Sequence, residues 1–167
     1  MDYLVSHEGR NDFICNLVYS LKGNTLVLFQ YVEKHGAVLH NKMMKRLDDQ
    51  LHYVYGGTDV KDREEVRVLV EKANDNVILA SYGTFSTGVN IKKIDNVVFA
   101  SPSKSRIRNL QSIGRGLRKA EGKTTMRLFD IADDLQCNNY TLKHLKERIN
   151  IYNEEGFSYE IKQFNLK

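Results

Sequence analysis

The sequence lacks the features that mark several specialised classes of protein. Its only two cysteines, Cys15 and Cys137, stand far apart, so neither a disulfide framework nor a zinc-ligand spacing is indicated. No apolar run approaches the about 18 residues that a membrane-spanning helix needs. The opening residues, MDYLVSHEGR, form no apolar leader. The sequence therefore favours a protein of a reducing compartment, without membrane contact.

What is present is typical of a soluble globular domain. Hydrophobic residues make up 41% and charged residues 28% of the 167 residues, a length that gives one domain with a sizeable core. The net charge of +4 favours a polyanionic partner. This charge is a weak indication alone, because many soluble proteins are equally basic.

Apolar runs alternate with helical patterns along the chain. Five runs predict buried strands at Asn24–Val32, Leu51–Gly57, Asn76–Gly83, Asn96–Ser103 and Thr124–Asp133, and the alternating segment Ser158–Leu166 is interpreted as a further edge strand. Helices are expected at His7–Leu21, Glu33–Leu47, Val60–Ala73 and Tyr140–Glu155. This alternation predicts an α/β fold with a mostly parallel central sheet and helices on both faces.

Four segments that follow the predicted strands are rich in glycine, serine and threonine. They read QYVEKHG, YGGTD, SYGTFSTGVN and SPSKSR. In parallel sheets, functional residues gather in the loops at the carboxyl ends of the strands. Short hydroxyls and exposed peptide N–H groups are suited to phosphate contacts. Each single loop could equally hold ordinary turn residues, but four of them at one edge favour a phosphate-binding surface.

The segment NLQSIGRGLRK, Asn109–Lys119, places two glycines and two arginines in an otherwise helical pattern. On a helix, Arg115 and Arg118 share one side with Gln111, opposite an apolar stripe. Gly114 and Gly116 each cost about 1 kcal/mol relative to alanine in a helix, which indicates close approach of another surface. Two arginines pointing one way suit a phosphate chain, although a solvated basic helix face is the alternative interpretation.

Several segments together resemble superfamily 2 helicases. QSIGRGLR resembles motif VI, NVILASYGTFSTGVNIKKIDNVVFASP resembles motif V with its following strand, and NTLVLFQYVEKHGAVLHNKM resembles motif IV. VYGGTDVKDREEVRVLVEKANDNVILAS resembles the block that connects motifs IV and V. Their order and spacing match from Thr25 to about Asp134, and the tail after that is similar to the phage-type branch of the superfamily.

The resemblance implies a RecA-like three-layer domain, the second motor domain of an ATP-dependent DNA helicase that acts on single-stranded or branched DNA in recombination and repair. Residues 1–167 would be one such domain from a longer two-motor protein. Its partners would be DNA and the first RecA-like motor domain, which would hold most of ATP and Mg²⁺. A cytoplasmic location is expected, in the host cell if the chain is phage-encoded.

The resemblance also implies residue roles. Arg115 and Arg118 would be catalytic and reach the ATP phosphates, with Arg118 the expected γ-phosphate finger. The remaining ATP contacts would come from Gln111, Gly88 and Asn90. The residues expected to grip the nucleic-acid backbone are Gly56, Gly57, Thr58, Thr84 and Ser86. Motif V departs from the family pattern, since its run to Gly88 is one residue longer and Asn90 replaces an aspartate.

No Gly-x-x-x-x-Gly-Lys-Ser/Thr stretch and no Asp-Glu-x-His stretch occur in the chain. The arginines could therefore complete an ATPase site, but the β- and γ-phosphates and Mg²⁺ would need residues from elsewhere. The sequence predicts half of a motor that is inactive alone. The alternative is a RecA-like nucleic-acid-binding module without catalysis. The residues do not distinguish DNA from RNA.

No metal site is predicted. Asp130, Asp133 and Asp134 follow a strand, and we interpret them as helix caps or partners of basic residues, including Arg127. The scattered histidines, among them His35 and His144, are expected to pack or to be solvated. Packing roles are also expected for Met43, Met44 and both cysteines.

Overall fold

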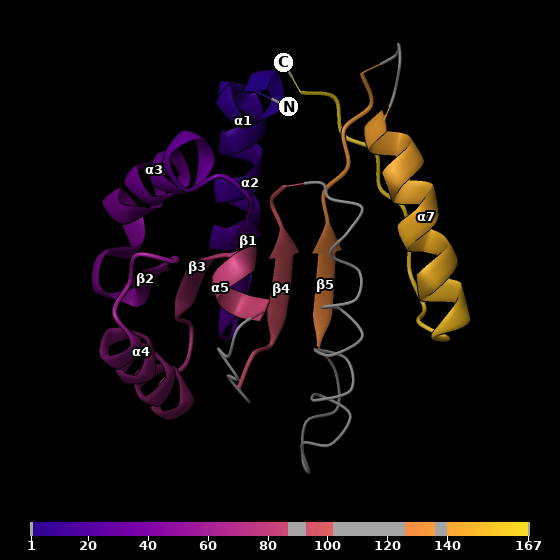
Figure 1. Ribbon diagram of the computed structural model, residues 1–167. Coiled ribbons are helices and arrows are strands. Elements are labelled where there is room, and N and C mark those ends of the chain that lie inside the picture. The colour runs from indigo at the N-terminus through magenta and orange to yellow at the C-terminus, as the bar shows by residue number, and fades with distance from the viewer. Residues whose placement is uncertain (1, 87–92, 102–125, 136–139, 167) are drawn as a thin grey trace.

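The computed structural model describes residues 2–86, 93–101, 126–135 and 140–166, and within these it leaves the side chains of Phe85 and Ser86 undescribed. Five strands form one parallel sheet in the order β2-β3-β1-β4-β5 (Figure 1). The strands are β1 (Thr25–Phe29), β2 (Leu51–Val54), β3 (Val77–Ser81), β4 (Asn96–Phe99) and β5 (Arg127–Asp130). The predicted α/β fold with a parallel sheet is confirmed.

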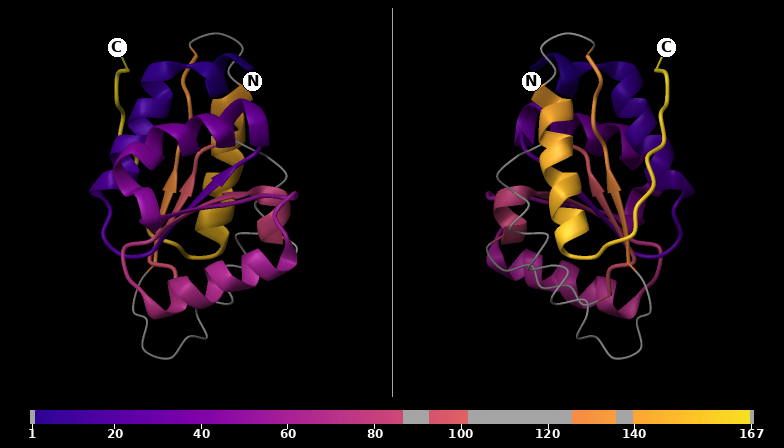
Figure 2. Two further views of the ribbon diagram at one scale, coloured as in Figure 1. Left: turned by 90° about the vertical axis from the view of Figure 1, so that its left-hand side faces the viewer. Right: turned by 90° about the vertical axis from the view of Figure 1, so that its right-hand side faces the viewer.

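The helices form two layers, one on each face of the sheet (Figure 2). One face is covered by α1 (Asp2–Ser6), α2 (Glu8–Ser20) and α3 (Ala37–Leu47), where Ile14, Leu39 and Met43 pack against Val27 and Phe29. The other face is covered by α4 (Val60–Lys72), α5 (Tyr82–Ser86) and α7 (Tyr140–Glu154). The short α1 was not predicted.

The three central strands are buried along their whole length. Every residue of β1, β3 and β4 is buried, which is why their sequences read as continuous apolar runs. The pairing register places Phe29 beside Ser81 and Phe99 beside Asp130, so neighbouring strands end nearly level. The loops that follow the strands are thereby gathered at one edge.

Each strand is shorter than its apolar run predicted. After β1 the chain forms a π-helical turn, Val32–Gly36, before α3 begins. Gly36 is needed there because a Cβ at this position would lie 2.5 Å from the Phe29 ring and 2.7 Å from the Tyr53 hydroxyl. The predicted helix Glu33–Leu47 therefore begins as a wider turn that lets the chain pass over β1.

The predicted edge strand Ser158–Leu166 is wrong. Residues 157–166 carry no strand pairing and pass the β5 side of the molecule as an extended tail (Figure 2). The tail is held partly by ring contacts, since the rings of Phe164 and Phe13 have centroids 5.1 Å apart. The alternating pattern does not mark a buried face here, because Tyr159, Ile161 and Phe164 are 48%, 71% and 60% exposed.

Some single-residue expectations also changed. Leu69 was predicted on the buried face of α4 but is 46% exposed, and Met44 is 42% exposed while Met43 is fully buried. Cys15 is buried as expected, and Cys137 lies outside the described residues. Among the described helices, none has the length and apolar character to cross a membrane.

Candidate nucleotide and nucleic-acid interface

The turn after β2 contains three of the residues predicted to contact nucleic acid. Gly56 and Gly57 are exposed, and Thr58 is half-buried. The Thr58 N–H donates to the Tyr55 carbonyl (2.9 Å), and the Thr58 hydroxyl accepts from the Tyr55 N–H (3.0 Å). A Cβ at Gly56 would meet nothing within 4 Å. The turn is therefore fixed at its base and open at its tip.

Arg63, near the start of α4, stabilises the Gly56–Thr58 turn through hydrogen bonds to its backbone. Its Nε donates to the Thr58 carbonyl at 2.9 Å and its Nη2 donates to the Gly56 carbonyl at 3.2 Å. Asp59 caps the same helix by accepting from the Lys61 N–H. With two of its carbonyls bound to one guanidinium, the turn presents a defined backbone shape to solvent.

The residues after β3 are bound into the protein interior. The hydroxyl oxygens of Ser81 and Thr84 lie 2.8 Å apart, and Thr84 is only 3% exposed. A direct contact between the Thr84 hydroxyl and a nucleic acid would require it to turn away from Ser81. Gly83 is exposed, and a Cβ there would meet nothing within 4 Å. Of the described residues here, Gly83 offers exposed backbone, whereas the Thr84 hydroxyl is buried.

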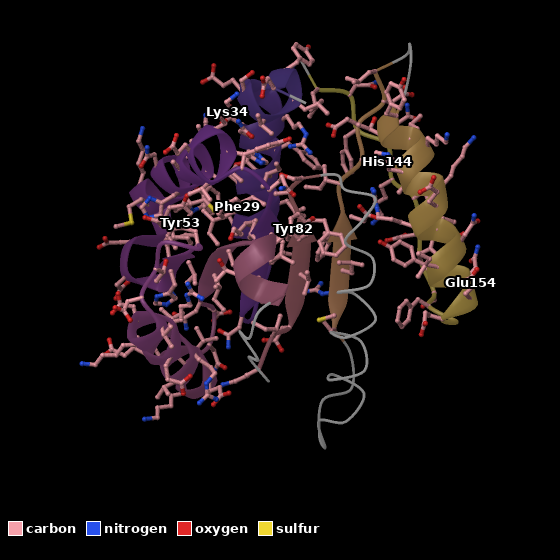
Figure 3. The ribbon with its side chains drawn as sticks, in the orientation of Figure 1. Phe29, Lys34, Tyr53, Tyr82, His144 and Glu154 are labelled. Atoms are coloured by element: carbon pink, nitrogen blue, oxygen red, sulfur yellow. The ribbon has the colours of Figure 1, made fainter. Side chains whose placement is uncertain are left out.

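Ser101 is the second residue after β4 and connects the chain segments that follow β1, β3 and β4. Its hydroxyl accepts from the Gln30 N–H (3.2 Å) and lies 2.9 Å from His35 Nδ1. Its carbonyl accepts from the Tyr82 hydroxyl at 2.9 Å. Tyr82 also packs against Phe99, with ring centroids 5.9 Å apart, and Figure 3 shows it beside β4. Residues that follow β1, β3 and β4 thus meet at one buried serine.

Two buried ion pairs bind the helical layers to the end of β5 and to the chain that follows it. Arg10 of α2 donates through Nε to Asp133 (2.7 Å) and through Nη2 to the Ala100 carbonyl (2.8 Å). On the opposite face, Arg148 of α7 donates to Asp130 at 2.6 Å. Asp130 and Asp133 therefore pair with arginines from the two covering layers, and not with Arg127, which donates to Asn96.

These contacts shift the pKa of several groups. Burial, reinforced by the positive charge of Arg10, lowers the pKa of His35 to about 3, so the ring is neutral at neutral pH. Burial alone would lower the pKa of Arg148, but the hydrogen bond and charge of Asp130 outweigh it and raise that pKa. Burial and the same carboxylate raise the pKa of Tyr152, whose hydroxyl donates to Asp130 at 2.7 Å.

The predicted residues divide into two groups. The structure brings the turn of Gly56, Gly57 and Thr58 and the loop of Thr84 to the carboxyl edge of the sheet. Ser86 ends α5 at the same edge, and its side chain is undescribed. The residues predicted to contact ATP lie outside the described residues: Gly88, Asn90, Gln111, Arg115 and Arg118.

Sequence reasoning missed the polar residues that support this edge, which are the buried Arg10, His35, Ser101 and Arg148 and the partly buried Arg63. Ser101 lay at the end of a predicted strand, and Arg148 lay within the predicted helix Tyr140–Glu155. Nothing in the local pattern marked Arg10 or His35. Among residues 2–86, 93–101, 126–135 and 140–166, no cluster of three or more histidine, cysteine or acidic side chains could hold a metal ion.

Comparison with known protein families matches residues 9–120 to the helicase conserved C-terminal domain. The chain belongs to this family. The match covers α2, the sheet from β1 to β4 and the predicted arginine segment. The predicted membership of a helicase C-terminal domain is confirmed, and with it the RecA-like fold.

Two curated relatives agree with the family. This helicase C-terminal domain is 36% identical over 173 aligned residues to the ATP-dependent DNA helicase uvsW of Enterobacteria phage T4, covering 94% of the chain and 34% of that protein. It is 27% identical to the putative ATP-dependent helicase IRC3 of Saccharomyces cerevisiae, covering 72% of the chain and 20% of the relative. The chain thus spans about a third or less of the length of these relatives.

Solved structures support the same fold. The crystal structure of T4 UvsW matches with a TM-score of 0.79 and 35% identity, over 95% of this chain and 35% of that one. The C-terminal domain of the DEAD-box protein Dbp5 matches with a TM-score of 0.65 and 15% identity, over 90% and 82% of the two chains. The second likeness concerns the fold alone.

Proposed function

We propose that this chain is the second motor domain of an ATP-dependent DNA helicase or translocase that remodels single-stranded or branched DNA in recombination and repair. The observation that carries the proposal is 36% identity over 94% of the chain to a protein named as an ATP-dependent DNA helicase. In this proposal residues 1–167 form one domain of a longer protein and dock against a first RecA-like motor domain.

The turn after β2 supports a backbone grip on DNA. Its exposed glycine peptide groups, fixed by Arg63, suit hydrogen bonds to phosphate oxygens. Contacts of this kind are independent of base sequence and weaken as salt rises. Thr84 would contribute to DNA binding indirectly, because the hydrogen bond between its hydroxyl and Ser81 fixes the conformation of the loop after β3.

Arg115 and Arg118 would act on ATP held between the two motor domains. Arg118 would place its guanidinium on the γ-phosphate, where charge develops during transfer. Arg115 would bind the phosphate chain beside it, with Gln111, Gly88 and Asn90 contributing to nucleotide binding. Mg²⁺ would neutralise the phosphates and would be held mainly by the first motor domain.

The experiment is ATP hydrolysis by this chain alone and by a complete two-motor protein, with and without single-stranded and branched DNA. The chain alone should be inactive, since it has no P-loop. In the complete protein, Arg118→Ala should lower turnover by about 10³-fold or more, while DNA binding persists. Arg46→Ala is the matched control, because Arg46 is an exposed arginine that contacts Tyr19. Unchanged turnover in Arg118→Ala would refute the finger assignment.

A non-catalytic nucleic-acid-binding module is the second candidate. The single observation that favours this candidate is that the sequence contains no P-loop. It predicts DNA binding by this chain together with no ATP hydrolysis in any complete protein that contains it.

A further inference from the structure

Ser101 joins the residue that follows β1 to the loop after β3, which carries Thr84 of the proposed DNA grip. It is 1% exposed, and it takes hydrogen bonds from residues that follow β1 and β3. Tyr82, which donates to its carbonyl, opens the short helix that carries Thr84. In the sequence, Ser101 lies 14 residues before Arg115 and 17 residues before Arg118.

The hydrogen-bond direction at Ser101 can be assigned from its neighbours. Asn11 Nδ2 donates to the Val5 carbonyl at 2.9 Å, so Asn11 Oδ1 is the atom that faces His35 Nε2 at 3.2 Å. An amide oxygen only accepts, so the neutral His35 ring carries its hydrogen on Nε2. His35 Nδ1 is then an acceptor, and the Ser101 hydroxyl donates to it while accepting from the Gln30 N–H.

The result is a one-way chain of donors that runs from the Gln30 N–H through Ser101, His35 and Asn11 to the carbonyl of Val5 in α1. Every member from Ser101 to Asn11 is buried. A buried acceptor that loses its donor keeps the full cost of desolvation. The chain therefore holds Ser101 in one position relative to the turn after β1, and the Tyr82 hydroxyl binds the same serine to the loop after β3.

We propose that Ser101, with His35 and Tyr82 as positioning residues, couples DNA binding to ATP hydrolysis in this motor domain. The inference rests on the proposed function. DNA bound at the loop after β3 would set the position of Tyr82, and through Tyr82 that of Ser101, from which the chain continues toward Arg115 and Arg118. The coupling acts through hydrogen bonds, so none of the three residues touches ATP.

His35 offers a matched pair of variants. Asparagine at position 35 keeps an acceptor near the place of Nδ1, and so keeps the bond to Ser101. Glutamine keeps a donor near the place of Nε2, and so keeps the bond to Asn11. Each variant loses one of two buried hydrogen bonds of similar length, 2.9 Å and 3.2 Å, so their effects on folding should be comparable. Only the glutamine variant disconnects Ser101.

The experiment measures ATP turnover of the complete two-motor protein without DNA and across a range of single-stranded and branched DNA concentrations. DNA binding without ATP and thermal unfolding are measured on the same proteins. His35→Gln and Tyr82→Phe should lose about tenfold in DNA-stimulated kcat, with DNA-free turnover and DNA affinity retained. His35→Asn should retain stimulation, although its unfolding temperature falls as much as that of His35→Gln.

Two results would overturn the proposal. If His35→Asn and His35→Gln are stimulated equally, or if the loss of stimulation follows the loss of folded protein, Ser101 has only a structural role. If the unmodified protein itself shows no DNA-stimulated turnover, the motor function fails and the coupling fails with it. The first result leaves the motor function standing, so the two failures are distinguishable.

Discussion

Arg148 and Asp130 form a buried ion pair of 2.6 Å that binds α7 to the last residue of β5. The pair is incompletely satisfied, because Arg148 Nη1 and Nη2 and Asp130 Oδ1 are buried without a hydrogen-bond partner among the described residues. Tyr152 donates to the same Asp130 oxygen as Arg148. This small cluster is the polar link between α7 and the sheet.

Removing one charge of this pair should destabilise the domain strongly. Arg148→Met leaves the Asp130 carboxylate buried and unpaired, and we expect a loss of about 3–5 kcal/mol in the free energy of unfolding. The double variant Arg148→Met, Asp130→Leu removes both charges and should recover most of the loss. Urea denaturation of the three proteins measures the difference. A double variant as unstable as the single one would contradict this account of the pair.

Arg63 should matter for DNA binding more than its helical neighbour Arg67. Arg63→Ala frees the Thr58 and Gly56 carbonyls and loosens the turn, so we expect about three- to tenfold weaker DNA binding. Arg67 pairs with Glu64 and Glu71 on the surface of α4, and Arg67→Ala is the matched control. Fluorescence anisotropy with labelled single-stranded DNA checks both. Equal affinities in the two variants would mean that the turn does not carry the grip.

Stability should fall as the pH drops below 6.5 because of His35. The folded state keeps this ring neutral down to a pKa of about 3, whereas the unfolded chain binds a proton near the ordinary value of 6.5. Unfolding thus takes up a proton in that window, and stability present above pH 6.5 is lost toward pH 3. Between pH 7.5 and 5 the unmodified protein should lose about 2 kcal/mol more than His35→Asn. Chemical denaturation of both proteins at the two pH values tests this difference, which vanishes if His35 titrates normally.

Gly36→Ala should destabilise the domain, whereas Gly83→Ala should not. Alanine at position 36 would press a methyl group against the Phe29 ring and the Tyr53 hydroxyl, which Figure 3 labels on the same side of the sheet. We expect a cost of about 1–3 kcal/mol. Gly83→Ala meets nothing within 4 Å and should leave stability unchanged or slightly raised. Thermal unfolding of both variants decides, and similar melting temperatures would refute the close approach.

The sequence predicted the strands better than the polar contacts. Each observed strand lies within a predicted apolar run, because full burial of β1, β3 and β4 leaves no polar alternation. The predicted strands extended too far at their carboxyl ends, because Tyr31 and Tyr55 continue the apolar runs but lie after β1 and β2 have ended. Local patterns also carry no information on partners that lie far away, as with Arg10 and Asp133, which are 123 residues apart.

The candidate site was predictable in position and only partly in composition. The sheet places the glycine-rich turn after β2 and the loop after β3 at the carboxyl edge, as the sequence predicted, while their contact with nucleic acid stays a prediction. The supporting residues His35 and Ser101, 66 residues apart, became apparent only when the sheet order was known. The roles of Gly88, Asn90, Gln111, Arg115 and Arg118 remain predictions, because these residues lie outside the described part of the chain.

The central place of β1 has a consequence for biosynthesis. β1 is the first strand in the chain, yet both of its partners, β3 and β4, lie about 50 to 70 residues downstream. A ribosome that makes the chain from its N-terminus therefore releases β1, with its four consecutive apolar residues Leu26–Phe29, long before either neighbouring strand exists. Until β4 has left the exit tunnel, at least one edge of β1 lacks its partner strand. Slow translation of residues 30–99 would prolong the interval in which nascent chains can aggregate or recruit a chaperone.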